Sequence, residues 1–187
     1  MKINFLITSL FLLTLILSSC IDQKEIVVKS DQKLALVDSL INLQKTGLDG
    51  KSLSKSGSIN GVQETLDIQI DTSFVKSEFK VLNNKKFDYI FTNGGYTKTE
   101  EGNITTYQRK PEEYAGPLLL QLTFDDDQLT QLYLIEERDN YLYRTRNEAQ
   151  FDFDKSEGLI SNYQLQGLQK IIALDSTGYQ IRGKVKL

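Results

Sequence analysis

Three consecutive pieces of sequence decide the fold of this chain: LLLQLTF at 118–124, DDD at 125–127 and QLTQLYLI at 128–135. Leu118, Leu120, Leu122 and Phe124 recur at the period of two that is typical of a strand with one buried face. The three aspartates predict a turn, because short acidic side chains favour turn conformations. A strongly apolar strand returns from Leu129 to Ile135, so we expect this hairpin at the centre of an antiparallel sheet.

Further strands are predicted on both sides of this hairpin. Before it, strands are expected at 64–70, 87–92, 96–98 and 104–109, the last two joined by a turn at 100–103. Residues 111–117, with a proline at each end, predict a break. After the hairpin, strands are expected at 140–144 and 148–153, followed by a turn at 154–158.

One pattern recurs near the C-terminus: YQLQG at 163–167 returns as YQIRG at 179–183, and a hairpin loop is expected at 175–178. Tyr163 and Leu165 share one strand parity, whereas Leu168 and Ile172 share the other. The side chains that point inward must then switch from one parity to the other near Gly167. We expect a β-bulge there, because an extra residue produces this switch. A glycine in this place either curves the strand or lets a ligand approach the backbone, and we favour curvature.

Two helices are predicted before most of the strands. The first covers 30–46, with Ser30 or Asp31 as N-cap and Gly47 as the stop. Its apolar residues at helical spacing are Leu34, Val37, Leu40, Ile41 and Leu43. A shorter helix is expected at 71–82, with Phe74, Val75, Phe79 and Leu82 on its apolar side. Residues 47–61 are rich in Gly, Ser and Lys without an apolar period, which predicts a flexible connector.

These elements predict an α+β fold, in which two helices from the N-terminal half pack on a curved, largely antiparallel sheet meander of about seven to nine strands. The first helix could instead dock a partner helix, but packing on its own sheet is favoured. The length of 187 residues suits one domain, which we place at 30–187.

The N-terminus carries a targeting pattern. Lys2 precedes an apolar run from Phe5 to Leu17, which is shorter than the roughly 20 residues of a spanning helix. The run ends in Leu17-Ser18-Ser19-Cys20, and Cys20 is the only cysteine. This motif resembles the lipobox of bacterial lipoproteins, and an ordinary signal peptide with an incidental cysteine is the alternative. The resemblance implies a signal peptide at 1–19 and a lipidated, acylated Cys20 that begins a tether at 20–29.

The residues after Cys20 bear on localisation. Ile21 occupies the place where an aspartate would resemble the inner-membrane retention signal, and Asp22 comes one residue later. Asp22-Gln23-Lys24-Glu25 resembles a surface-export signal of other Gram-negative lineages. We therefore expect a lipid anchor in the bacterial cell envelope, at the outer membrane, facing either the periplasm or the surface.

The composition restricts the chemistry. With no histidine and a lipidated cysteine, Ser-His-Asp and Cys-His catalysis and ordinary zinc sites are excluded. Carboxylate catalysis would remain, with Glu112, Glu113, Glu136 and Glu137 as candidates. The aspartates at 125–127 lack the spacing of a calcium loop, so we read them as a turn without metal. No cofactor is expected, and the net charge of −3 argues against nucleic acid.

Noncatalytic binding or assembly at the envelope is the leading functional interpretation, and the protein is not expected to be an enzyme. Nine tyrosines and nine phenylalanines could line a groove for lipids or sugars. Two helices on a long antiparallel sheet resemble the half-open barrels that carry lipoproteins or lipids across the periplasm. A lipid- or glycan-binding carrier is therefore one alternative, and a carboxylate-dependent glycan hydrolase is the other. The expected partners are the membrane, through the anchor, and an envelope protein, lipid or glycan.

Overall fold

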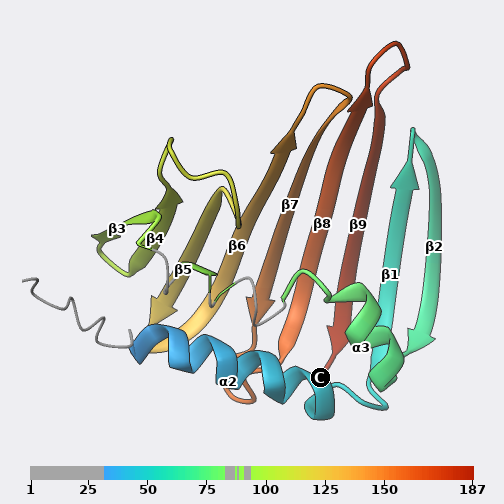
Figure 1. Cartoon of the computed structure of the whole chain (residues 1–187). Helices are drawn as coiled ribbons and strands as arrows, with labels where there is room; N and C mark the ends of the chain where they lie inside the picture. Colours follow the sequence, from blue (N-terminus) through green and yellow to red (C-terminus); the bar gives the residue numbers. More distant parts are fainter. Residues whose placement is uncertain (1–31, 83–86, 88, 91–93) are drawn as a thin grey trace, which may run out of the picture.

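A computed structural model describes residues 32–82, 87, 89–90 and 94–187 of the chain. Helices α2 (Gln32–Gly47) and α3 (Thr72–Glu78) pack on one face of a single curved antiparallel sheet (Figure 1). This confirms the α+β fold that the sequence predicts. The expected signal peptide, Leu17, Ser18, Ser19, Cys20, the tether and both proposed caps of the first helix lie outside the described residues.

The sheet follows a meander with one long-range closure. Its spatial order is β2-β1-β9-β8-β7-β6-β5-β4-β3, so the N-terminal hairpin pairs with the last strand. The bounds are β1 (Ser52–Ile59), β2 (Val62–Gln69), β3 (Tyr96–Glu101), β4 (Ile104–Arg109), β5 (Leu119–Asp125), β6 (Gln128–Asp139), β7 (Tyr143–Phe153), β8 (Ile160–Ile171) and β9 (Thr177–Lys186). Every neighbouring pair is antiparallel.

The central hairpin has the predicted form. Leu120 and Leu122 of β5 lie opposite Leu134 and Leu132 of β6, and all four side chains are fully buried. Asp126 and Asp127 have φ of 48° and 62°, so a two-residue turn with two left-handed residues joins the strands. This turn type matches the twist of the strands, and aspartate tolerates it better than most residues.

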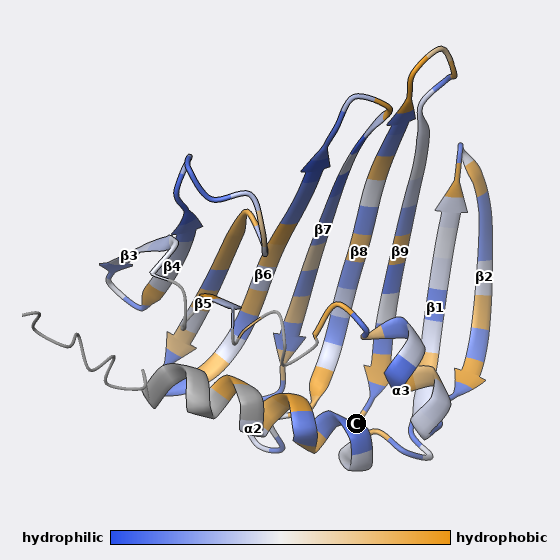
Figure 2. Ribbon diagram, viewed as in Figure 1, coloured by the Kyte–Doolittle hydropathy of each residue, from blue (hydrophilic) through white to orange (hydrophobic). Residues whose placement is uncertain are grey.

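Residues of alternating polarity give the sheet two different faces (Figure 2). We call the face that packs on α2 and α3 the helix face and the opposite one the outer face. One register row of the helix face runs through Leu122, Leu132, Phe151 and Tyr163, which form the floor of the core. The helices and the residues directly after them cover this row with Val37, Ile41, Leu48, Val75 and Phe79.

The buried stripe of α2 departs from the predicted one at a single turn. Leu43 is 39% exposed, whereas Gln44 is only 1% exposed. Nε2 of Gln44 donates to the carbonyl of Gly158 at 2.9 Å, and its Oε1 accepts from the backbone N–H of Ile160 at 2.8 Å. The side chain is satisfied despite its burial, and it joins α2 to the start of β8.

The expected flexible connector at 47–61 is wrong, because residues 52–59 form β1. Apolar periodicity fails there because Ser52, Ser54, Ser56 and Ser58 alternate with a helix-face set that includes Lys55 and Gly57. Pairing with β2 and β9 on both sides stabilises this strand despite its low intrinsic propensity. Asn60 and Gly61, with φ of 49° and 88°, form its turn to β2.

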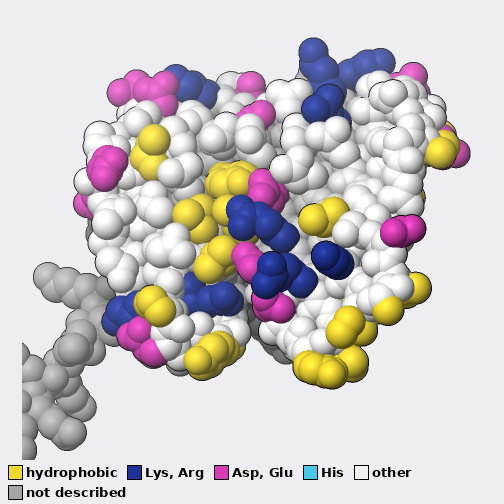
Figure 3. All heavy atoms as spheres, turned by 90° about the horizontal axis from the view of Figure 1, so that it is seen from above, with side chains coloured by type: hydrophobic (Ala, Val, Ile, Leu, Met, Phe, Trp, Pro, Cys, Tyr) yellow, Lys and Arg dark blue, Asp and Glu magenta, His cyan; other side chains and the backbone are white. Residues whose placement is uncertain are grey.

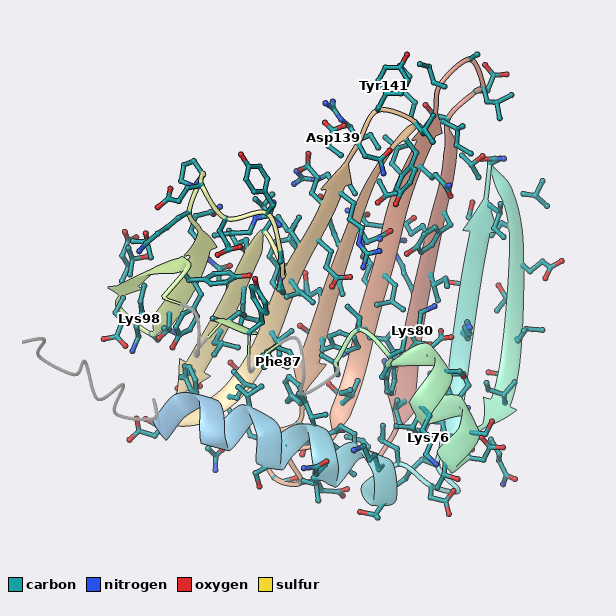
Figure 4. The ribbon with its side chains drawn as sticks, in the orientation of Figure 1. Lys76, Lys80, Phe87, Lys98, Asp139 and Tyr141 are labelled. Carbon is teal, nitrogen blue, oxygen red and sulfur yellow. The ribbon has the colours of Figure 1, made fainter. Side chains whose placement is uncertain are left out.

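Two other strand predictions need correction. Phe87, Tyr89 and Ile90, within the expected strand at 87–92, are helical, and Phe87 lies buried between α2 and the sheet (Figure 4). The expected strands at 140–144 and 148–153 are one strand, β7, and Tyr141 lies in the exposed loop before it. Both errors come from aromatic pairs, whose spacing of two residues does not distinguish a strand from a loop or helical turn.

The predicted helix at 71–82 is confirmed in place but shorter. Asp71 is its N-cap, and the Asp71 side chain accepts from the backbone N–H of Phe74 at 2.6 Å. Phe79 and Leu82 lie beyond the helix but are buried in the core, as their apolar spacing predicts. The β3–β4 hairpin and the turn at 154–158 also lie where the sequence predicts them.

The C-terminal repeat has a different cause from the predicted one. Pairing is regular through Gly167, so the expected bulge there is wrong, and the irregularity lies at Ser161. Leu168 and Ile172 are exposed, so the inward face does not change at Gly167. The register instead places Tyr163 opposite Gly183 and Tyr179 opposite Gly167, with each tyrosine ring over the facing glycine. The loop joining the strands is 172–176.

Candidate functional site

The candidate site is an apolar groove on the helix face, where β1, β2 and β9 extend beyond the helices. Its volume is about 500 Å³. The apolar side chains that line it are Ile59, Val62, Leu66, Tyr179 and Ile181. Because these strands continue past α3, neither α2 nor α3, the helices among the described residues, covers this part of the helix face (Figure 1).

The groove exposes aliphatic side chains to solvent. Val62 is 72% exposed and Leu66 is 53% exposed, and both lie on the edge strand β2. Seen from above, hydrophobic side chains gather at the lower right of the molecule and at its centre, where charged side chains flank them (Figure 3). Scattered apolar residues are ordinary on a surface, but aliphatic residues gathered in a hollow are typical of a binding site.

A glycine deepens the floor of the groove. Gly57 of β1 lies in register between Ile181 of β9 and Glu64 of β2. A Cβ atom built on Gly57 would meet nothing within 4 Å. The backbone is therefore the floor here, and side chains on neighbouring strands form the walls.

The end of the groove nearest α3 is closed by a partly buried polar cluster. Lys55 Nζ lies 2.7 Å from Glu78 Oε1, and the Tyr163 hydroxyl donates to the same oxygen at 2.9 Å. Lys55 also lies over the Phe74 ring, 5.6 Å from its centroid. Burial, reinforced by the Glu78 carboxylate, raises the pKa of Tyr163, which keeps the phenol neutral as a donor. The cluster fixes α3 to β1 and β8.

The other end of the groove is bounded by Tyr179. Its hydroxyl donates to Asn147 Oδ1 at 3.3 Å, and its ring lies over Gly167. Burial raises the pKa of Tyr179, and Glu136 raises it further. The hydrogen bond and the contact with Gly167 fix the ring at this end of the groove, where Tyr179 is part of the lining.

The four candidate catalytic carboxylates do not lie in this groove. Glu112 is exposed in the loop between β4 and β5, where Glu113 has a structural role. Glu113 Oε1 accepts from the Tyr89 hydroxyl at 3.3 Å and from the backbone N–H of Tyr114 at 3.1 Å. These hydrogen bonds hold the loop closed.

Glu136 and Glu137 are consecutive on β6 and therefore point to opposite faces. Glu137 lies on the outer face, 3.5 Å from Arg146. Glu136 lies on the helix face, and together with Glu113 it reinforces the effect of burial, which raises the pKa of Tyr96 to about 12. The structure thus brings Glu113 and Glu136 toward one phenol and separates Glu112 and Glu137 from them.

The aspartates at 125–127 form the β5–β6 turn, and Asp125 pairs with Lys155. Within the described part of the chain, no group of three Asp, Glu, His or Cys side chains is placed to hold a metal ion. None of the described helices has the length and apolar character of a membrane span.

Comparison with known protein families, with curated proteins and with solved structures found no match to this chain. The groove itself was missed from the sequence because β1 reads as a connector. A usable signal was present, since Ile59 and Val62 flank an Asn60-Gly61 pair, the strongest short hairpin pattern. That pattern predicts the hairpin but not its pairing with β9, which completes the groove.

Proposed function

We propose that this protein is a noncatalytic binding protein, anchored by lipid at Cys20 to a bacterial envelope membrane, and that its groove binds an acyl chain. The groove supports this proposal because it offers aliphatic walls, a tyrosine side chain at one end and a backbone floor. An acyl chain has the same apolar and extended character. The lipid-binding carrier is thereby favoured over the glycan hydrolase, whose candidate carboxylates lie elsewhere.

The expected affinity follows from buried area. Each methylene group that leaves water contributes about 0.8 kcal/mol, so about ten groups contribute about 8 kcal/mol before the entropic cost of association. The groove is open along one side, because β2 is the edge strand. Weak and reversible binding is therefore expected, which suits a protein that holds a chain transiently near a membrane.

Titration of the purified protein with a dansyl-labelled fatty acid tests the groove. Leu66→Glu places a charge in the apolar wall and should weaken binding at least tenfold, because an ionised carboxylate is costly to bury. Leu168→Glu is the matched control, since Leu168 and Leu66 are both 53% exposed but lie on opposite faces of the sheet. Equal effects of the two substitutions, or no binding by the unchanged protein, would contradict the proposal.

The anchor is tested separately by metabolic labelling with palmitate in a bacterial host. Cys20→Ala should abolish the label, because the thiol that carries the lipid is removed. Cys20→Ser tests the same point with less change in polarity. Label retained in either variant would show that the lipobox interpretation is wrong.

A further inference from the structure

The outer face carries a continuous surface of glutamine side chains, remote from the groove. Two adjacent register rows cross it. One contains Gln121, Tyr133, Gln150, Gln164 and Arg182, and the next contains Glu148, Gln166 and Gln180. We call Gln121, Gln131, Gln150, Gln164 and Gln166 the amide face.

Hydrogen bonds join these side chains both along single strands and between neighbouring strands. Gln166 Nε2 donates to Glu148 Oε2 at 2.9 Å, and the Tyr133 hydroxyl donates to the same oxygen at 2.8 Å. Gln164 Nε2 donates to Gln166 Oε1 at 3.3 Å. Gln131 and Gln150 both donate to Asp152 Oδ1, at 2.9 and 3.2 Å. Each amide has two N–H donors and two acceptor lone pairs, so capacity remains for a ligand.

The amide face is hollowed rather than flat. One hollow of about 370 Å³ is lined by all five glutamines of the amide face and by Tyr133. A second, of about 510 Å³, shares Gln150 and Gln164 with it and extends to Ser54 and Ser56 of β1. Between β5 and β9, four interstrand spacings of about 4.8 Å give a path of roughly 19 Å.

Positive and negative side chains are interspersed on this face. Arg146 Nε lies 2.8 Å from Glu148 Oε1, and hydrogen bonds from Arg146, Tyr133 and Gln166 lower the pKa of that carboxyl group. Arg182 Nε donates to Gln164 Oε1 at 3.3 Å. Because the charges are of both signs, the face does not attract a strongly charged ligand. An uncharged polar ligand binds by hydrogen bonds and needs no such attraction.

We propose that the amide face binds a neutral polysaccharide chain. Sugar hydroxyl groups donate and accept hydrogen bonds, and glutamine amides do both. Tyr133 and the aliphatic stems of the glutamines offer apolar area to the C–H faces of sugar rings. Because the network already restrains the side chains, less rotamer entropy is lost on binding.

Native gel electrophoresis of the purified full chain tests the proposal. The gels contain dextran, laminarin or hydroxyethyl cellulose, which are neutral, or polygalacturonate, which is anionic. Retarded migration in at least one neutral gel is expected. The double substitution Gln150→Ala/Gln164→Ala should weaken the affinity about tenfold, as the loss of two hydrogen bonds implies.

The matched control is Gln169→Ala, which removes a glutamine from the helix face of the same strand, β8. It should leave migration unchanged. No retardation in any neutral gel, retardation by polygalacturonate alone, or equal retardation of the double variant would overturn the proposal. The double variant should still bind the dansyl-labelled fatty acid, which separates the two faces and shows that it is folded.

A second measurement tests the proposal without the double variant, in case that variant fails to fold. In the ¹⁵N-labelled unchanged protein, the side-chain amide signals of Gln150 and Gln164 should shift when the retarding polysaccharide is added. The signal of Gln169 should stay in place. Shifts confined to Gln169, or absent at Gln150 and Gln164, would equally overturn the proposal.

Discussion

Gly183→Ala should destabilise the protein, although alanine normally suits a strand better than glycine. Gly183 lies in β9 directly opposite Tyr163 of β8. A Cβ atom at this position would overlap the Tyr163 ring, which packs edge-on against Phe79 with 5.1 Å between ring centroids. The ring must then move, and its hydroxyl would lose the hydrogen bond to Glu78.

The magnitude follows from the two contacts that the ring would lose. The edge-to-face aromatic pair is worth about 0.5–1.5 kcal/mol, and a hydrogen bond to a carboxylate about 1.5–3 kcal/mol. The lower chain entropy of alanine in the unfolded state returns about 0.5 kcal/mol. The expected loss in the free energy of unfolding is therefore about 1.5–4 kcal/mol.

Urea unfolding followed by circular dichroism measures this loss. Gly57→Ala is the control, because a Cβ atom at Gly57 meets nothing within 4 Å and the substitution should stabilise slightly. In a Tyr163→Leu background, the cost of Gly183→Ala should fall below about 1 kcal/mol, since the ring is gone. A Gly183→Ala protein within about 0.5 kcal/mol of the unchanged chain, where about 1.5 kcal/mol or more is expected, would refute the reasoning.

Three further predictions concern stability. Gln44→Ala should cost about 2–4 kcal/mol in urea unfolding, because it leaves the Gly158 carbonyl and the Ile160 N–H without their partner; a cost below about 1 kcal/mol would count against this. Replacing Asp126-Asp127 by Asn-Gly should raise the melting temperature by about 2–4 °C, since that pair suits two left-handed residues, and an unchanged or lower melting temperature would contradict the turn assignment. Burial raises the pKa of folded Tyr96 from 10.0 to about 12, so the unfolded chain loses this proton first as pH rises. The stability from the neutral phenol is then complete below pH 10 and lost between pH 10 and 12, and Tyr96→Phe should lose less stability across that window than the unchanged protein.

The elements that the sequence predicted well are those whose partners are close in sequence. The β5–β6 hairpin shows its own apolar alternation and its own turn, so local residues specify it. The amphipathic pattern of α2 was equally local, apart from Gln44, whose burial depends on backbone groups at Gly158 and Ile160. No sequence window around residue 44 contains those groups.

The candidate site was harder to predict, because it depends on pairing between distant segments. Gly57 and Ser58 suggest a flexible loop until β9 pairs with them. The recurring tyrosine and glycine are visible in the sequence. The register that places Tyr163 over Gly183 is set by the pairing of β8 with β9. The four candidate glutamates can be recognised in the sequence. Which of them lie in a loop, and which face of the sheet the others point to, depends on where β4, β5 and β6 begin and end.

The pairing of β1 with β9 has a consequence for the order of events when the chain is made. The N-terminal hairpin emerges first, but its neighbour is the last strand, and the hydrogen bond from Gly178 to Asn60 joins residues 118 positions apart. Closing so long a loop has a high entropic cost, so this pairing is expected to form slowly. The groove takes its walls from β1, β2 and β9, so it does not exist until β9 has been made and has paired with β1. The proposed acyl-chain binding would therefore depend on β9. Removal of β9 should abolish that binding while leaving the β5–β6 hairpin paired.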